Sequence, residues 1–149
     1  MRNTFRGGVH PAERKELSRD ARLRLYDPKG EMVFPLQQHI GKPAKPIVQK
    51  GDEVLVGQKI AEADGFVSAH IYSSCSGKVK GIEKRRVLTG GFAECIVIDN
   101  DGQFVPAADY SVRESEGNLS ANEIIQRVQD AGVVGLGGAG FPTHVKLKP

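Results

Sequence analysis

Closely spaced glycine and proline residues between positions 31 and 100 set the strongest limit on how this chain folds. The segments between them are short and rich in Val and Ile, as at residues 53–56, 66–71, 78–80 and 95–98. Segments of this length between turn-forming residues are typical of strands. The chain has 18 glycines and no tryptophan among 149 residues, so we expect a core of aliphatic side chains. The pattern predicts a small antiparallel barrel or sandwich.

The motif VxxGDxVxxGQxI at residues 48–60 refines this prediction. We expect Gly51 and Asp52 to turn the chain between two strands and Gly57 to turn it back, because glycine and aspartate favour turns. A Ser-Gly pair follows at residues 76–77. This order resembles the hammerhead of biotinyl and lipoyl carrier domains, a flattened β-barrel.

Carrier activity is not expected from this resemblance. Carrier domains present a lysine at a hairpin tip, and counting back from the Ser-Gly pair places that tip near Phe66 and Val67. No lysine occurs between Lys59 and Lys78. We therefore interpret the barrel as a structural or docking module.

Residues 1–30 form a basic arm with eight Arg or Lys residues and four Asp or Glu residues. Such an arm favours anionic lipid, an acidic partner protein or nucleic acid, or is simply a solvated terminus, which is the interpretation we prefer. Nucleic acid is the weakest of these alternatives. No aromatic residue for base stacking is interleaved with the basic residues between positions 6 and 24.

Beyond a barrel at residues 31–100, the polar segment 101–119 is expected to be a linker, and a short helix follows it. Ser120 is a suitable N-cap residue, and Glu123 three positions later completes a capping box. Gly132 is expected to end the helix. The helix has one apolar face, formed by Ile124, Ile125 and Val128.

Residues 120–149 contain a glycine cluster at 135–140 that is followed by Pro142. Bare glycine backbone allows close approach of an anion, and N–H groups at a helix start bind phosphate. Lys146 would add a positive charge about one helical turn further on. The spacing GxGxxG is met by Gly135, Gly137 and Gly140. That spacing is a weak signal alone, and glycines that serve only close packing are an equally good interpretation.

The longer string GLGGAGFPTHVKL at residues 135–147 closely resembles the flavin loop of the flavin-binding subunit of respiratory complex I, whose pattern is GxGGAGFPTxxK. The resemblance implies that Lys146 contacts FMN or its phosphate and that Phe141 lines the NADH site. Pro142 and Thr143 are expected to be structural. The FMN phosphate and ribityl chain would be cradled by Gly135, Gly137, Gly138 and Gly140.

The order of motifs along the chain is similar to that of the C subunit of the Rnf-type ion-translocating electron transport complex. This order is FRGGVHP at residues 5–11, PLQQHIG at 35–41, the barrel motif and then the flavin loop. The resemblance implies a mainly β barrel-sandwich hybrid, followed by the truncated start of an α/β Rossmann-like domain that binds FMN and NADH. The chain would thus be an N-terminal fragment, inactive alone, of an iron–sulfur flavoprotein subunit.

In that family, hydride passes from NADH to FMN, and electrons then pass singly through 4Fe-4S clusters. We name no catalytic residue, because the flavin itself performs this chemistry. The cluster ligands of the family lie in CxxCxxCxxxCP runs, whereas this chain has only Cys75 and Cys95. We expect no metal site, and buried hydrogen-bonding roles for His10 and His39.

The resemblance also implies the setting of the protein. A translocase of this kind couples electron transfer between NADH and ferredoxin to ion movement across the membrane, through several partner subunits. The chain has no run of 18 apolar residues that would span a bilayer. We therefore expect a peripheral protein on the cytoplasmic face of the membrane. The alternative function is a docking module that binds no cofactor by itself.

Overall fold

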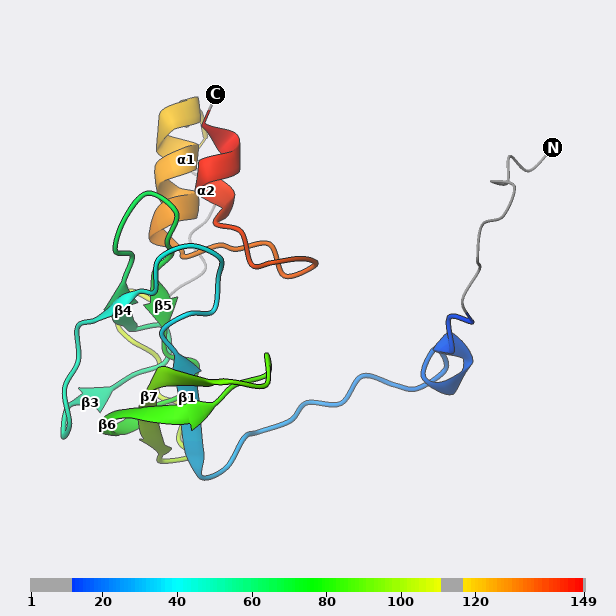
Figure 1. Ribbon diagram of the computed structural model, residues 1–149, viewed down its shortest axis with the longest axis vertical. Helices are drawn as coiled ribbons and strands as arrows, with labels where there is room; N and C mark the ends of the chain where they lie inside the picture. Colours follow the sequence, from blue (N-terminus) through cyan, green and yellow to red (C-terminus); the bar gives the residue numbers. More distant parts are fainter. Residues whose placement is uncertain (1–11, 111–116, 149) are drawn as a thin grey trace.

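The computed structural model describes residues 12–110 and 117–148 of the chain. In this part of the chain, seven strands form two antiparallel sheets, one in the order β1-β7-β6-β3 and one in the order β2-β4-β5 (Figure 1). The strands are β1 (Glu31–Pro35), β2 (Lys45–Pro46), β3 (Glu53–Val54), β4 (Lys59–Glu62), β5 (Ile71–Tyr72), β6 (Gly77–Arg86) and β7 (Phe92–Asn100). The helices are η1 (Lys15–Leu17), a 3-10 helix, and the α-helices α1 (Ala121–Asp130) and α2 (Thr143–Leu147).

The VxxGDxVxxGQxI motif forms the two turns that the sequence predicts. At the first turn, the Gln49 N–H donates to the Asp52 carboxylate at 2.9 Å, and the Asp52 N–H donates to the Gln49 carbonyl at 3.1 Å. At the second, the Leu55 N–H donates to the Gln58 side chain at 3.0 Å. Both turns need a residue with positive φ, which is 98° at Gly51 and 83° at Gly57.

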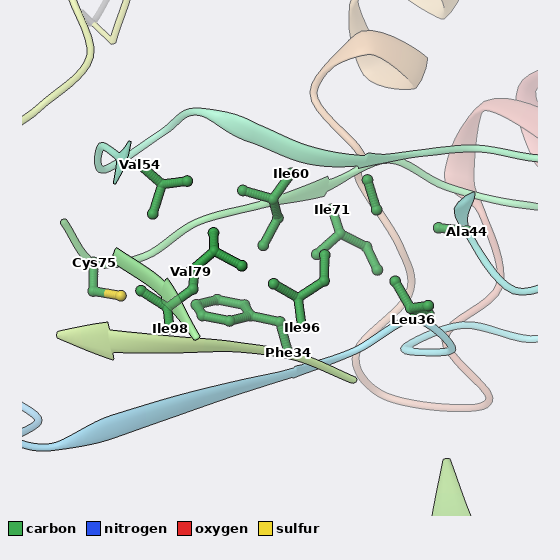
Figure 2. Close-up of a cluster of buried hydrophobic side chains, with 11 residues drawn as sticks. Phe34, Leu36, Ala44, Val54, Ile60, Ile71, Cys75, Val79, Ile96 and Ile98 are labelled. Atoms are coloured by element: carbon green, nitrogen blue, oxygen red, sulfur yellow. The ribbon is translucent and has the colours of Figure 1, made fainter. Parts of the chain in front are cut away.

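The core lies between the two sheets and is almost entirely aliphatic (Figure 2). Ile60 of β4 meets Ile96 and Ile98 of β7, and all three side chains are completely buried. Burial of each such side chain stabilises the fold by roughly 1.5–3 kcal/mol. The mainly β prediction and the aliphatic core are therefore confirmed.

The strand predicted at residues 66–71 is wrong except at its end, because the described strand β5 contains only Ile71 and Tyr72. The backbone groups of the remaining residues bond to other partners. The Val67 carbonyl accepts the Lys42 N–H at 3.0 Å, and the Ala69 N–H donates to a histidine ring. This segment is a loop packed on the barrel, at the position expected for the lysine-bearing tip of a carrier domain.

Part of the predicted linker lies along the barrel. The Val56 N–H donates to the Val105 carbonyl at 2.9 Å, and the Ala107 N–H donates back to the Val56 carbonyl at 2.9 Å. Phe104 packs against the edge of the core. Residues 101–110 thus extend the barrel, while the domain boundaries stay predictions.

Helix α1 begins with the predicted capping box. The Ser120 N–H donates to the Glu123 carboxylate at 2.8 Å, and the Glu123 N–H donates to the Ser120 hydroxyl at 3.4 Å. Gly132 follows the helix with a φ of 64°. A Cβ atom there would lie only 2.5 Å from the His70 carbonyl oxygen, so this glycine also lets the helix end approach the barrel.

The Rossmann-like α/β domain predicted from residue 120 is not confirmed. Within residues 117–148 the structure has the two short helices α1 and α2, which lie side by side, and no parallel sheet (Figure 1). A doubly wound sheet needs several strand–helix repeats, which a segment of this length does not hold.

The described part of the basic arm, residues 12–29, extends away from the barrel (Figure 1). Helix η1 within it has no buried residue, and Leu23 and Leu25 are fully exposed. The FRGGVHP motif, with His10, lies outside the described residues.

Candidate functional site

The glycine loop, residues 135–140, is the tip of a small hairpin. Val134 and Pro142 form an antiparallel bridge at its base, where the Thr143 N–H donates to the Val133 carbonyl at 3.0 Å. The Gly135 N–H donates to the Phe141 carbonyl at 3.0 Å. Pro142 is fully buried, as a structural role requires. These hydrogen bonds fix the base of the loop and the position at which α2 begins.

The tip of this loop offers backbone donors to the solvent. Within the described residues, the N–H groups of Leu136, Gly137 and Ala139 donate no hydrogen bond. Leu136 is 92% exposed. Backbone N–H groups that are free on an exposed loop are suited to bind an anionic group such as phosphate.

The four glycines of the loop have different surroundings. A Cβ atom at Gly137 or Gly138 would meet no described residue within 4 Å, so packing in the described part of the chain does not require glycine there. Gly140 is buried with a φ of 66°, and a Cβ atom would lie 2.8 Å from the Gln38 carbonyl oxygen and 3.0 Å from the His39 Cα. Two of the predicted ligand glycines thus face open space, and one faces the barrel.

Lys146 and Phe141 lie beside the first glycine of the loop. The Lys146 Nζ atom is 5.5 Å from the centre of the Phe141 ring, and a Cβ atom on Gly135 would be 3.8 Å from the same Nζ. Residues 131–149 contain two lysines and no acidic residue. The structure therefore brings three predicted site residues together in an electropositive segment.

The sequence did not predict the contact between Gly140 of the glycine loop and the barrel backbone at Gln38 and His39. His39 is 5% exposed, and its Nε2 accepts the Ala69 N–H at 3.2 Å. Nδ1 must then carry the ring proton and donates to the Ile40 carbonyl at 3.1 Å. This buried ring fixes the backbone on which Gly140 rests. The PLQQHIG motif contained the signal, but its proximity to the glycine loop is a tertiary contact.

Neither histidines nor cysteines form a second site in the described part of the chain. Cys75 and Cys95 are free and buried, and burial raises the pKa of both thiols. In contrast, burial lowers the pKa of His144, the buried residue of α2, because it disfavours the charged imidazolium. The described residues contain no group of three His, Cys, Asp or Glu side chains that could hold a metal ion.

No helix within residues 12–110 and 117–148 is long and apolar enough to cross a membrane.

Comparisons with known proteins agree on one family. The RnfC barrel sandwich hybrid domain family matches residues 3–103. The chain is 42% identical over 149 residues to the C subunit of the proton-translocating ferredoxin:NAD(+) oxidoreductase complex of Clostridium ljungdahlii, and it covers 33% of that relative. It is 44% identical over 146 residues to the Na(+)-translocating counterpart of Acetobacterium woodii, of which it covers 32%.

A third relative is the C subunit of the ion-translocating oxidoreductase complex of Serratia proteamaculans, which is 38% identical over 151 residues. The match includes 97% of this chain and 20% of that relative. The chain thus spans a third or less of the length of these three relatives. The domain match and the identity along the whole chain establish that it belongs to the RnfC family and corresponds to the N-terminal part of these relatives.

Proposed function

We propose that this chain belongs to a membrane-bound complex that couples electron transfer between NADH and ferredoxin to ion translocation. Family membership and the names of the relatives support this proposal. In it, the chain lies at the cytoplasmic face as a peripheral part of the RnfC protein and contacts other subunits of the complex.

The glycine loop is the proposed contribution of this chain to an FMN site. The observation that carries the proposal is the combination, in one short loop, of open space beside Gly137 and Gly138, N–H groups without a hydrogen bond, and the Lys146 ammonium beside Gly135. A phosphate fits such a place, because the N–H groups bind its oxygens and the lysine balances its charge. Bound flavin would supply the hydride and single-electron chemistry.

Each residue of the loop has a distinct role in this proposal. Gly135, Gly137 and Gly138 allow close approach of the flavin phosphate and ribityl chain, and Lys146 binds the phosphate or the flavin. Phe141 lines the side on which NADH binds. Gly140, which cannot approach a ligand freely because it rests on the barrel, holds the loop in place.

The 4Fe-4S clusters of the family do not fit this chain. A cluster takes four cysteine ligands, whereas the chain has two cysteines, which are buried and twenty positions apart and so form no CxxC motif. We assign the clusters to the part of the longer relatives that the chain does not match.

A fluorescence titration of FMN with the 149-residue chain tests the proposed site. We expect saturable quenching that is lost in Gly138→Val, since a branched side chain would occupy the space of the ligand. The matched control is Gly91→Val, at another glycine with open surroundings and no left-handed φ. Binding that persists in Gly138→Val would show that the loop is not the site.

A docking module without its own cofactor is the second candidate function. Exposed apolar side chains support it, because Ile40, Phe66 and Leu136 are all exposed. Phe66 lies near the end of α2, with its ring centre 6.0 Å from the Lys148 Nζ. Large exposed apolar side chains are typical of surfaces that further protein covers. Absence of FMN binding by a chain whose circular dichroism shows it to be folded would favour this candidate.

A further inference from the structure

The hairpin of β6 and β7 projects beyond the sheet that supports it (Figure 1). Strand β1 pairs with β7 only at residues 95–99, whereas β6 and β7 pair with each other as far as Arg86 and Phe92. Residues 84–93, which we call the hairpin tip, are therefore two-stranded, and no third strand of the described residues lies beside them.

The turn of the hairpin tip is ordered and presents apolar side chains. The Val87 N–H donates to the Gly91 carbonyl at 3.0 Å, and the Gly90 N–H donates to the Val87 carbonyl at 2.9 Å. Leu88 at the apex is fully exposed, at 108%, and Phe92 is 74% exposed. Neither side chain contributes to the barrel core, so both are available to a binding partner.

Positive charge surrounds these apolar side chains. The hairpin tip contains Lys84, Arg85 and Arg86 and no acidic residue before β7 begins. Arg85 is committed to the fold, since its guanidinium bonds to Glu31 at 3.0 Å and to Glu83 at 2.9 Å. In the part of the chain that the structure describes, neither Lys84 nor Arg86 forms an ion pair.

Strand alternation places the unpaired charges beside the apolar residues. Lys84 and Arg86 are two positions apart on β6 and so share one face of the hairpin. Arg86 lies opposite Phe92, and Lys84 lies opposite Glu94, with which it forms no ion pair in the described structure. Arg85, with its two carboxylate partners, lies on the other face. The outer end of one face, with Arg86 and Phe92, is thus both cationic and apolar, and Lys84 and Glu94 lie behind it.

We propose that the hairpin tip binds the surface of an anionic lipid membrane. Leu88 and Phe92 enter the headgroup region, while Lys84 and Arg86 contact lipid phosphates, as in other interfacial segments that combine apolar and basic residues. A protein partner is less suited to this surface. A stable protein interface buries about 800 Å² on each side, and the apolar residues here protrude singly at an apex. The proposal does not depend on flavin binding.

Fluorescence of a single introduced tryptophan tests this proposal, because the natural chain has none. The probe is the full 149-residue chain with Leu88→Trp, and the control is Ile47→Trp, at an exposed apolar position on a different part of the barrel. Both are titrated with vesicles of phosphatidylcholine alone and of phosphatidylcholine with added phosphatidylglycerol, at low and high salt.

We expect a blue shift of the Leu88→Trp emission with the anionic vesicles only, weakened by high salt. Adding Lys84→Glu and Arg86→Glu should raise the lipid concentration for half-maximal shift by about tenfold or more. The basic arm makes a site-specific probe necessary, since it could bind vesicles by itself. Vesicle binding without a shift at position 88, or an equal shift at position 47, would overturn the proposal, as would no binding at all.

Discussion

Replacing Gly140 with alanine tests whether the barrel holds the glycine loop in place. The residue has a φ of 66°, in the left-handed region that alanine disfavours. The added Cβ would lie 2.8 Å from the Gln38 carbonyl oxygen and 3.0 Å from the His39 Cα. Both obstacles are backbone atoms, which cannot turn aside as a flexible side chain would.

The expected magnitude follows from two unfavourable contributions and one favourable one. The left-handed conformation costs a non-glycine residue about 1–2 kcal/mol. Overpacking against a fixed neighbour costs about 1–3 kcal/mol. Reduced entropy of the unfolded chain returns about 0.4–1 kcal/mol. We expect the free energy that holds the loop on the barrel to fall by about 1–5 kcal/mol, which is between about fivefold and a few thousandfold in the opening equilibrium.

Amide hydrogen exchange is the appropriate assay, because it reports local opening separately from global unfolding. The Gly135 N–H, which bonds to the Phe141 carbonyl, should exchange faster in Gly140→Ala by the factor given above. The matched control is Gly137→Ala, where a Cβ meets nothing within 4 Å and φ is not left-handed. Its stability should change by no more than about 0.5 kcal/mol.

The two variants should also separate packing from ligand binding. Gly137→Ala should weaken FMN binding although it leaves the loop docked, whereas Gly140→Ala should act through the loop itself. Unchanged exchange at Gly135 in Gly140→Ala would refute the reasoning, because the barrel would then not constrain the loop.

Three further perturbations test the surrounding structure. His39→Ala removes the acceptor of the buried Ala69 N–H and should destabilise the chain by about 1–3 kcal/mol in urea unfolding; an unchanged midpoint would contradict the assigned bond. The hydrogen bond from Lys80 and the positive charges of Lys80 and Arg85 lower the pKa of Glu31. The ionised Glu31 therefore stabilises the fold above the ordinary glutamate pKa of about 4.3, and this stabilisation is lost as the pH falls through the lower pKa of the folded state. The pH dependence of unfolding in Glu31→Gln should therefore be flatter in the acid range, and an identical profile would argue against the ion pairs. Burial raises the pKa of Cys75 and Cys95, and both thiols should react with a disulfide reagent only after denaturant is added.

Local sequence patterns were sufficient for several features because their causes are local. The turns of the barrel motif follow from glycine and from side chains that bond within three residues, and the same holds for the capping box of α1. Short apolar segments between turns indicated a small β structure with an aliphatic core. The family resemblance, which the comparisons confirm, rested on motif order along the chain.

Tertiary structure decided what sequence spacing leaves open. Residues 66–70 have a strand-like composition, yet they form a loop because Val67 and Ala69 bond to the segment that contains His39. The glycines of the loop look equivalent in the sequence, but only Gly140 meets the barrel backbone. The sequence alone determined which short elements can form and which residues are able to bind phosphate. Which glycine is structural and which face of the hairpin stays uncovered was decided only by the packing of segments that are distant in the chain. The reason is that the separation of two residues in the sequence does not reveal how far apart they lie in space.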